Sequence, residues 1–274
     1  RDRPDARGPA VSATSPLGEK RPAQRWSVGA AGPDAGPPPS SASPLGGQRP
    51  AQRWSVGAVI IDLDGTMVDT LGDFDAALNR TLADLGRPGV ARADIERFVG
   101  KGSAHLIRSA LRHGGLDDAG AQALHDGAWR RYQAHYLAIN GAHSAVYPGV
   151  IDGLHALRAR GLPLACLTNK PLAFARPLLD AKGLAGFFDH VFGGDSFART
   201  KPDPLPLIET CRALGTAPRQ TLMVGDSQND GLAARAAGCP VVLVTYGYNH
   251  GEPIGRAPHD RLIESLTELG DLLA

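Results

Sequence analysis

The stretch AVIIDLDGTMVDT, residues 58–70, decides the fold of this chain of 274 residues. It opens with a short β-branched run at 59–61, and the run ends in two aspartates and a glycine. A short apolar run bounded in this way is typical of a strand buried in a parallel sheet. Asp62 and Asp64 follow at the end of this strand, and Gly65 permits a sharp turn directly after them.

Similar apolar runs recur further along the chain, and helical patterns separate them. The other expected strands are residues 163–168, 221–225 and 241–245, and the expected helices are 150–160, 172–182, 204–214 and 230–237. Strands that alternate with helices in this order favour an α/β fold. The sequence therefore predicts a doubly wound parallel sheet, a Rossmann-like core.

The alternation stops between Gly65 and Pro148, where the pattern is helical throughout. Helices are expected at 74–85, 93–99, 103–111 and 119–139, and each is followed closely by glycine. An insertion of this length is too long for a loop. We expect a helical cap at 71–145, inserted after the first strand of a catalytic core formed by 56–70 and 146–274. Ligands bind at the carboxyl edge of such sheets, so the cap is a natural lid.

The first 55 residues are rich in Pro, Gly, Ser and Arg and lack apolar periodicity, which predicts a disordered extension at 1–55. They include a direct repeat, SPLGEKRPAQRWSVGA at 15–30 and SPLGGQRPAQRWSVGA at 43–58. One interpretation is a paired docking motif built on the two Arg-Trp pairs. The other is a tandem duplication, or upstream sequence, without function. The second is favoured because the second copy runs directly into the first strand.

Composition excludes several classes of protein. The net charge of +1 gives no electrostatic footprint for nucleic acid or an acidic membrane. No apolar run approaches the roughly 20 residues of a membrane helix, and no secretory segment is evident, so we expect a cytoplasmic protein, monomeric or homodimeric. Cys166, Cys211 and Cys239 are odd in number and widely spaced, which predicts reduced, buried thiols.

The first chemical feature is the pair of acids at the end of the first strand. Two carboxylates two residues apart can point into one site, where they could bind a hard divalent cation. They could also supply a nucleophile and an acid/base. The alternative is that Asp62 and Asp64 only shape the turn.

A second acidic segment, GDSQND at 225–230, comes directly after residues 221–224 of an expected strand. It delivers Asp226 and Asp230 to the same edge of the sheet. Four acids gathered there would repel one another unless a cation lay among them, so a metal is implied. Helix capping by Asp226, Ser227 or Asn229 is the alternative, and both interpretations can hold for different residues.

Two further elements complete a possible site for a phosphoryl group. Thr168 and Asn169 stand at a strand end, and Lys201 precedes Pro202 in a loop before a helix. A phosphoryl group in transfer spreads its charge over three oxygens and calls for hydroxyl and amide donors, a fixed ammonium and a metal. Thr168, Lys201 and Mg²⁺ would supply that set.

Four motifs of this chain, and the order in which they occur, resemble those of the haloacid-dehalogenase-like hydrolases. The resemblance covers about residues 57–274. The motifs are DLDGTMVD at 62–69, TN at 168–169, KP at 201–202 and GDSQND at 225–230. The resemblance implies a phosphomonoester hydrolase that works through an aspartyl-phosphate. Met67, where leucine is usual, conserves volume and should matter little.

The resemblance also implies a role for each residue of the site. Asp62 would be the nucleophile and Asp64 the acid/base. Thr168 and Asn169 would contact the phosphate, and Lys201 would stabilise both Asp62 and the transferring group. The Mg²⁺ ligands would be Asp62, Asp226 and the backbone carbonyl of Asp64, with Asp230 supporting them.

Shorter phrases resemble the phosphoglycolate phosphatases within that family. They are TNKP at 168–171, FGGD at 192–195, AAGCP at 236–240 and TYGYNHGEP at 245–253. This likeness implies a small phosphorylated metabolite as substrate, with 2-phosphoglycolate cleaved to glycolate and phosphate.

Three alternatives stay open. The chain could be a phosphosugar mutase, or a phosphatase for a sugar phosphate, a nucleotide or pyrophosphate. It could also be a binding protein without catalysis that uses the Arg-Trp segments, in which case Mg²⁺-dependent phosphate release would be absent. Removal of residues 1–54 is expected to leave a phosphatase activity intact.

The expected cap also suggests a contact for the substrate. Lys101 lies between Gly100 and Gly102 in a flexible, cationic turn. We expect it to neutralise the substrate carboxylate. The alternative is a solvated lysine between two helices.

Overall fold

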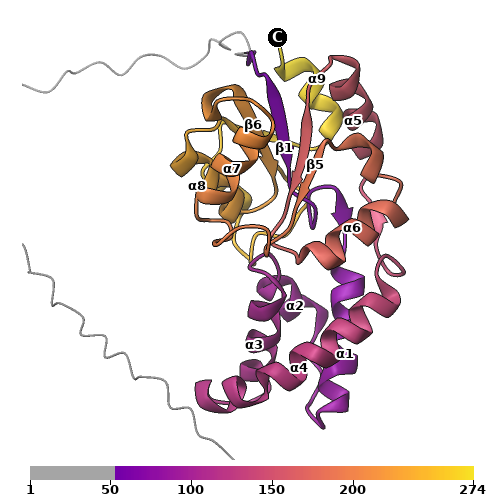
Figure 1. The fold of residues 1–274 in the computed structure, drawn as a ribbon. Coiled ribbons are helices and arrows are strands. Elements are labelled where there is room, and N and C mark those ends of the chain that lie inside the picture. Colours follow the sequence, from indigo (N-terminus) through magenta and orange to yellow (C-terminus); the bar gives the residue numbers. More distant parts are fainter. Residues whose placement is uncertain (1–52) are drawn as a thin grey trace, which may run out of the picture. The chain divides into compact units, whose positions relative to one another are not determined.

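The computed structural model describes residues 53–274 and has a parallel sheet of six strands at its centre (Figure 1). The strand order is β5-β4-β1-β6-β7-β8. The strands are β1 (Ala58–Ile61), β4 (Leu164–Leu167), β5 (His190–Phe192), β6 (Thr221–Gly225), β7 (Val241–Val244) and β8 (Arg261–Ile263). The central strand β1 pairs in parallel with β4 on one side and with β6 on the other. The predicted α/β fold is confirmed.

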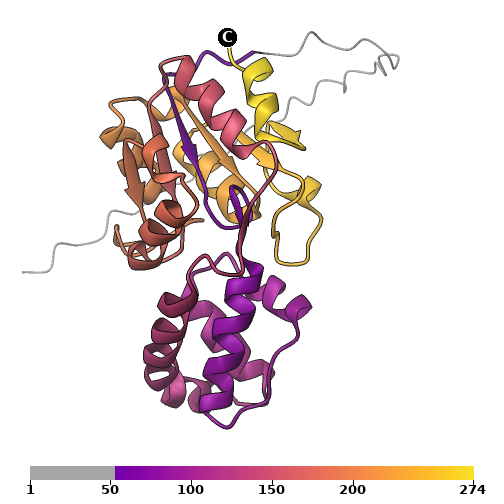
Figure 2. The same ribbon diagram turned by 90° about the vertical axis from the view of Figure 1, so that its right-hand side faces the viewer.

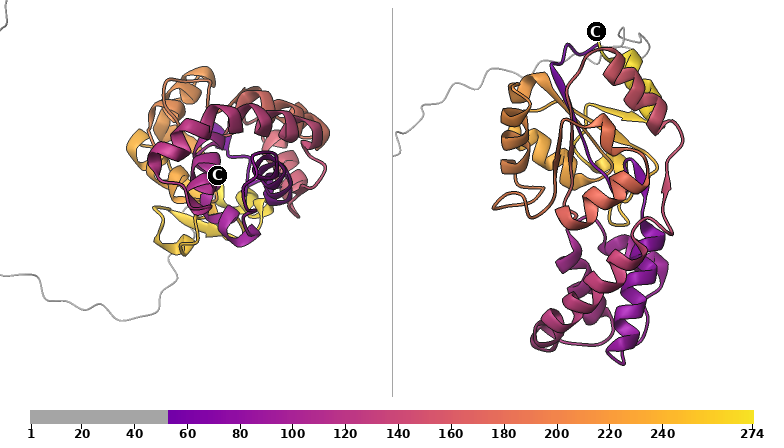
Figure 3. Two further views of the ribbon diagram at one scale, coloured as in Figure 1. Left: turned by 90° about the horizontal axis from the view of Figure 1, so that it is seen from below. Right: turned by 45° about the vertical axis from the view of Figure 1, so that its right-hand side comes forward.

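Helices cover both faces of the sheet because alternate side chains of its strands point to opposite faces. Val59 and Ile61 pack with α5 (Val150–Ala159), α6 (Leu172–Ala181) and α9 (Leu269–Leu272). Ile60 packs on the other face with α7 (Leu205–Ala213) and α8 (Gln228–Ala237). Figures 1 and 3 show these two helical layers on either side of the strands. The α/β part of the chain also has four short 3₁₀ helices, at Ala185–Phe187, Pro218–Gln220, Ile254–Arg256 and Leu266–Glu268.

The edge strands β5 and β8 were not among the sequence predictions. Each has only three residues, and their side chains are mostly half-buried or exposed. A sheet edge lacks the full burial that makes a continuous apolar run, so the sequence carries a weak signal there. The four central strands were predicted within one residue of their observed ends.

Four helices form the cap between β1 and β4 (Figure 2). They are α1 (Leu71–Asp84), α2 (Arg92–Phe98), α3 (Ser103–His113) and α4 (Asp118–Ile139). Their apolar faces share a core of their own, which includes the buried Tyr132 and Tyr136. A two-stranded antiparallel ribbon, β2 (Val68–Asp69) with β3 (Ala145–Val146), carries both crossings between cap and core.

Trp54 belongs to the folded part of the chain. Its backbone N–H donates to Leu272 O at 2.8 Å, and its carbonyl accepts from Ala274 N at 3.0 Å. Its indole packs, half-buried, against the sheet's core. The predicted boundary of the extension at residue 55 is therefore too late. Local composition could not reveal this, because the partners lie at the other end of the chain. The first repeat copy lies outside the described residues.

A chain beginning at residue 55 should be less stable than a chain beginning at residue 53. Loss of the Trp54 contacts should lower the free energy of unfolding by about 1–2 kcal/mol, since a half-buried indole contributes less than a fully buried side chain. The midpoint of thermal unfolding should fall by about 2–8 °C. Equal midpoints for the two chains would show that the Trp54 contacts do not stabilise the fold.

All three cysteines are buried and free, as predicted. The fold nevertheless brings two of them together, because α7 packs beside α8: the sulfurs of Cys211 and Cys239 lie 3.9 Å apart. Within residues 53–274, no helix is both long and apolar enough to cross a membrane.

Candidate active site

Three neighbouring strands end at one place and deliver the predicted site residues. Asp62 follows β1, Thr168 follows β4 and Asp226 follows β6. Because β1 lies between the other two, the chain turns to opposite sides of the sheet here, and such a switch point opens a crevice at the carboxyl edge. Lys201 reaches the same crevice from the loop before α7, where it is 3% exposed.

Three of the four predicted acids converge. Carboxylate oxygens of Asp62, Asp226 and Asp230 all lie within 4.8 Å of one another. Asp230 also caps its own helix, since its Oδ2 accepts from Ser227 N at 3.1 Å and from Ser227 Oγ at 2.9 Å. The N-cap residue of α8 is Ser227, one of the three residues expected to cap this helix, and Asp230 both supports this cap and belongs to the acidic cluster.

Lys201 ties two of these acids together. Its Nζ lies 2.6 Å from Asp230 Oδ1 and 3.1 Å from Asp62 Oδ1, and it donates to Leu167 O at 2.8 Å. Burial lowers the pKa of Lys201, but the ion pairs with Asp230 and Asp62 outweigh burial, so the net shift raises this pKa. The lysine is therefore a fixed ammonium.

The negative charge of the acidic cluster is not balanced by Lys201 alone. Lys201 is the ammonium that contacts it, and it cannot balance three buried carboxylates. Burial and the nearby Asp230 and Asp64 raise the pKa of Asp62 to about 7, although Lys201 opposes the shift. Burial, Asp230 and Asp62 raise the pKa of Asp226 well above its usual range.

One buried oxygen of the cluster accepts no hydrogen bond from residues 53–274. Asp62 Oδ1 is fully buried, and its contact with Lys201 is an ion pair without hydrogen-bond geometry. Hard divalent cations bind carboxylate oxygens. The donor set and its unbalanced charge therefore fit such an ion.

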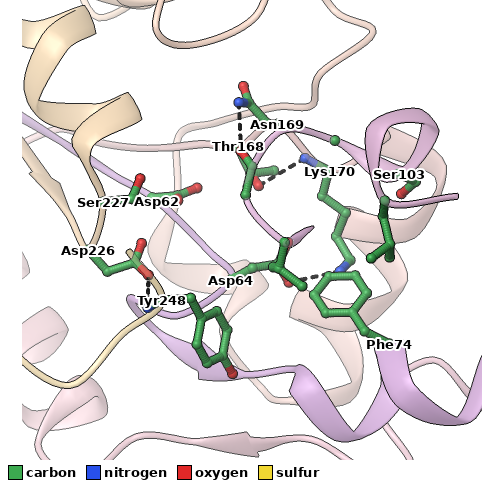
Figure 4. A pocket seen from close by; sticks show the side chains of 14 residues that line it. Asp62, Asp64, Phe74, Ser103, Thr168, Asn169, Lys170, Asp226, Ser227 and Tyr248 are labelled. Atoms are coloured by element: carbon green, nitrogen blue, oxygen red, sulfur yellow. Dashed lines mark hydrogen bonds and ion pairs between the residues drawn. The ribbon is translucent and has the colours of Figure 1, made fainter. Parts of the chain in front are cut away.

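The side chain of Asp64 turns away from this cluster. Its Oδ1 accepts from Thr70 Oγ1 at 2.7 Å and from Lys170 Nζ at 2.8 Å. The expected gathering of four acids is thus a cluster of three, Asp62, Asp226 and Asp230, without the Asp64 side chain. Figure 4 shows the Asp64 carboxylate apart from those of Asp62 and Asp226. Thr70 is a local partner, but Lys170 is 106 residues further along the chain, so the turn alone does not specify this direction.

Thr168 and Asn169 have different surroundings although they are adjacent. Thr168 Oγ1 accepts from Lys170 N at 3.1 Å, which leaves its own O–H free to donate into the cavity that it lines. The Asn169 amide nitrogen donates to Lys201 O and Gly100 O, and its oxygen accepts from Lys201 N. Its side chain therefore holds the lysine loop and the cap, so its predicted phosphate contact would fall to the backbone N–H.

The cap closes the other side of the crevice. The cavity between cap and core has an empty volume of about 460 Å³, part of it open to solvent. Phe74, Val99, Gly100, Gly102, Ser103 and Leu106 line it from the cap. The carbonyl of Gly100 accepts from both Asn169 and Asn229 of the core. The turn before α3 is thereby fixed over the strand ends.

Two residues at this site were given no role in the sequence predictions, Lys170 and Tyr248. Tyr248 N donates to Asp226 Oδ2 at 2.6 Å, while its hydroxyl accepts from Thr70 N at 3.0 Å. It thus joins the acidic cluster to the start of the cap (Figure 4). Both residues stand inside the phrases TNKP and TYGYNHGEP, which were the available signal. Lys101, in contrast, is exposed and does not line the cavity.

The fold and this site define a hydrolase with an acidic centre at the carboxyl edge of its sheet. The family model for haloacid dehalogenase-like hydrolases matches residues 56–238, which is more than half of the chain. The chain belongs to this family.

Relatives of known description point to one branch of the family. A phosphoglycolate phosphatase of Thiobacillus denitrificans is 43% identical over 77% of this chain and 92% of its own length. One from a plasmid of Cupriavidus necator is 44% identical over 78% of this chain and 92% of its own length. A crystal structure from Haemophilus somnus, described as a predicted phosphoglycolate phosphatase, has a TM-score of 0.74 and 32% identity. It aligns with 80% of this chain and 98% of its own.

Proposed function

We propose that the protein is a Mg²⁺-dependent phosphatase that hydrolyses 2-phosphoglycolate to glycolate and phosphate. The observation that carries the proposal is the buried cluster of Asp62, Asp226 and Asp230 with Lys201, at the end of the central strand. The relatives named above support the choice of substrate. We further propose that residues 71–145 act as the lid over the core.

In the first step, an oxygen of Asp62 attacks phosphorus and forms an aspartyl-phosphate. The bond between phosphorus and the ester oxygen breaks, and Asp64 gives a proton to that oxygen to release the alcohol. Lys201 offsets the negative charge of Asp62 and of the transferring group. The hydroxyl of Thr168 donates to a phosphate oxygen.

In the second step, water attacks the phosphorus of the aspartyl-phosphate. Asp64 now takes a proton from this water, the bond from phosphorus to the Asp62 oxygen breaks, and inorganic phosphate leaves. Asp62 is restored as a carboxylate, and Asp64 again holds the proton that the next turnover needs. The two proton transfers have opposite directions, so one acid/base residue can serve both.

Asp62, Asp226 and the Asp64 backbone carbonyl would hold Mg²⁺, and Asp230 would support them through Ser227 and Lys201. The bound ion would supply charge that lets the Asp62 carboxylate approach an anionic ester. Tyr248 N fixes the orientation of Asp226 in this arrangement.

Phosphate release from 2-phosphoglycolate should require Mg²⁺. A chelator such as EDTA should reduce the rate to background, and added Mg²⁺ should restore it, because the acidic cluster would otherwise repel the substrate. The measurement is phosphate release by the purified chain from 2-phosphoglycolate, sugar phosphates, nucleotides and pyrophosphate.

This screen also separates the alternatives. If the protein prefers another phosphate ester, the proposed phosphatase activity is supported and the proposed substrate, 2-phosphoglycolate, is refuted. Conversion of a sugar phosphate to its isomer without phosphate release would indicate a mutase. A lack of Mg²⁺-dependent turnover on every compound would contradict the proposal as a whole.

A further inference from the structure

One buried cation at the cavity has no part in the phosphoryl chemistry described above. Lys170 is 3% exposed and lines the cavity between cap and core. The other charged lining residues are the carboxylates Asp62, Asp64 and Asp226. Among the described residues that line this cavity, Lys170 is thus the one with a positive charge.

The surroundings of this ammonium leave it short of partners. It donates to Asp64 Oδ1 at 2.8 Å, which is its one hydrogen bond to the described residues. It lies 4.4 Å from the ring centre of Phe74 and 4.7 Å from that of Tyr136, both from the cap. A lysine ammonium has three N–H donors, and ring faces stabilise it less than an anion does. Two of its three N–H donors are therefore available to an anion in the cavity.

The position of Lys170 relative to Asp64 indicates where that anion would lie. In its proposed role, Asp64 meets the ester oxygen of the substrate. Lys170 Nζ is 2.8 Å from the Asp64 carboxylate. Any group of the substrate that contacts Lys170 must therefore lie within a few ångströms of the ester oxygen. A carboxylate separated from the ester oxygen by a single carbon satisfies this condition.

We propose that Lys170 is the specificity-determining residue for the substrate carboxylate, which it binds through its remaining N–H donors while it stays paired with Asp64. The ligand class is a small phosphomonoester with a carboxylate next to the ester carbon. This assignment rests on the proposed function and replaces the contact expected of Lys101, whose side chain is exposed. A buried cation binds a carboxylate more strongly than a solvated one does.

Two substrates of matched length test the assignment. Ethyl phosphate has a methyl group where 2-phosphoglycolate has its carboxylate. In Lys170→Met, kcat/KM for 2-phosphoglycolate should fall about 10- to 100-fold further than kcat/KM for ethyl phosphate, as expected for loss of a hydrogen bond between charged groups. Arg80→Met removes an exposed charge from α1 and should leave the ratio of the two values unchanged.

A binding measurement separates recognition from the positioning of Asp64. In an Asp62→Asn background, which prevents turnover, Lys170→Met should weaken the calorimetric affinity for 2-phosphoglycolate about 10- to 100-fold and that for ethyl phosphate less than threefold. Equal losses for both ligands would mean that Lys170 only positions Asp64, and would overturn the assignment. A loss of selectivity in Lys101→Ala but not in Lys170→Met would overturn it too.

The parent chain distinguishes a failure of this inference from a failure of the proposed function. If the parent hydrolyses both substrates with equal kcat/KM in the presence of Mg²⁺, the phosphatase activity is supported and the proposed recognition of the carboxylate by Lys170 is refuted. If it hydrolyses neither, the proposed function itself is wrong.

Discussion

Asp62→Asn should reduce phosphate release from 2-phosphoglycolate by a factor on the order of 10⁴ or more, because an amide cannot form the aspartyl-phosphate. The substitution keeps the shape of the side chain at the end of β1. It is measured as kcat at saturating Mg²⁺. Asp126→Asn is the matched control, since that carboxylate on α4 is 86% exposed, and its activity should equal that of the parent.

The same variant should be more stable than the parent when metal is removed. It takes away one of three carboxylates that lie within 4.8 Å of one another, so like-charge repulsion falls. In the presence of a chelator, the free energy of unfolding should rise by about 1–2 kcal/mol and the melting temperature by about 2–8 °C.

Together, the two measurements separate a chemical defect from a folding defect. A variant that has lost activity and gained stability in the presence of chelator is folded and lacks only its nucleophile. Activity within tenfold of the parent would contradict the nucleophilic role of Asp62.

Lys201→Met should damage both stability and activity. Without the ammonium, Asp62 and Asp230 stay buried and lose the cation that contacts both. Loss of one partner from a buried ion pair costs about 3–5 kcal/mol. The rate should also fall by roughly 10²–10³, because a fixed charge near the transferring group is lost. Urea unfolding and kcat, each measured with Mg²⁺, test the two effects.

A second substitution shows which part of the loss is electrostatic. Adding Asp230→Asn to Lys201→Met removes a carboxylate that would otherwise be buried without its partner, so part of the lost stability should return. Activity should not return, since the ammonium is still missing. If the double variant is as unstable as the sum of the two single variants, the ion pair is not the cause.

Much of the acidic centre was predictable because it depends on local rules. The period of a strand and the parallel order of the sheet place Asp62 and Asp226 at one edge. Ser227, one of the three residues expected to cap the following helix, is likewise indicated by its residue type and its place directly before α8. These properties need only short segments and the rule that parallel strands end together.

The partners of Asp64 were not predictable in this way. Lys170 comes from the end of β4, and the rings of Phe74 and Tyr136 that flank it come from two helices of the cap. No period or spacing links these positions, because they meet only when the cap packs on the core. The sequence could offer Lys101 as a cation in the cap, but it could not show that this side chain faces solvent.

By itself, then, the sequence determined the alternation of the four central strands with helices, the helical insertion and the acids that follow the central strands. The tertiary structure decided which charges share a cavity and which are buried, and it joined Trp54 to the end of the chain. The physical reason is the distance along the sequence over which each effect acts. Backbone preferences act over a few residues, whereas burial, ion pairing and the enclosure of a cation by aromatic rings depend on segments brought together only by folding.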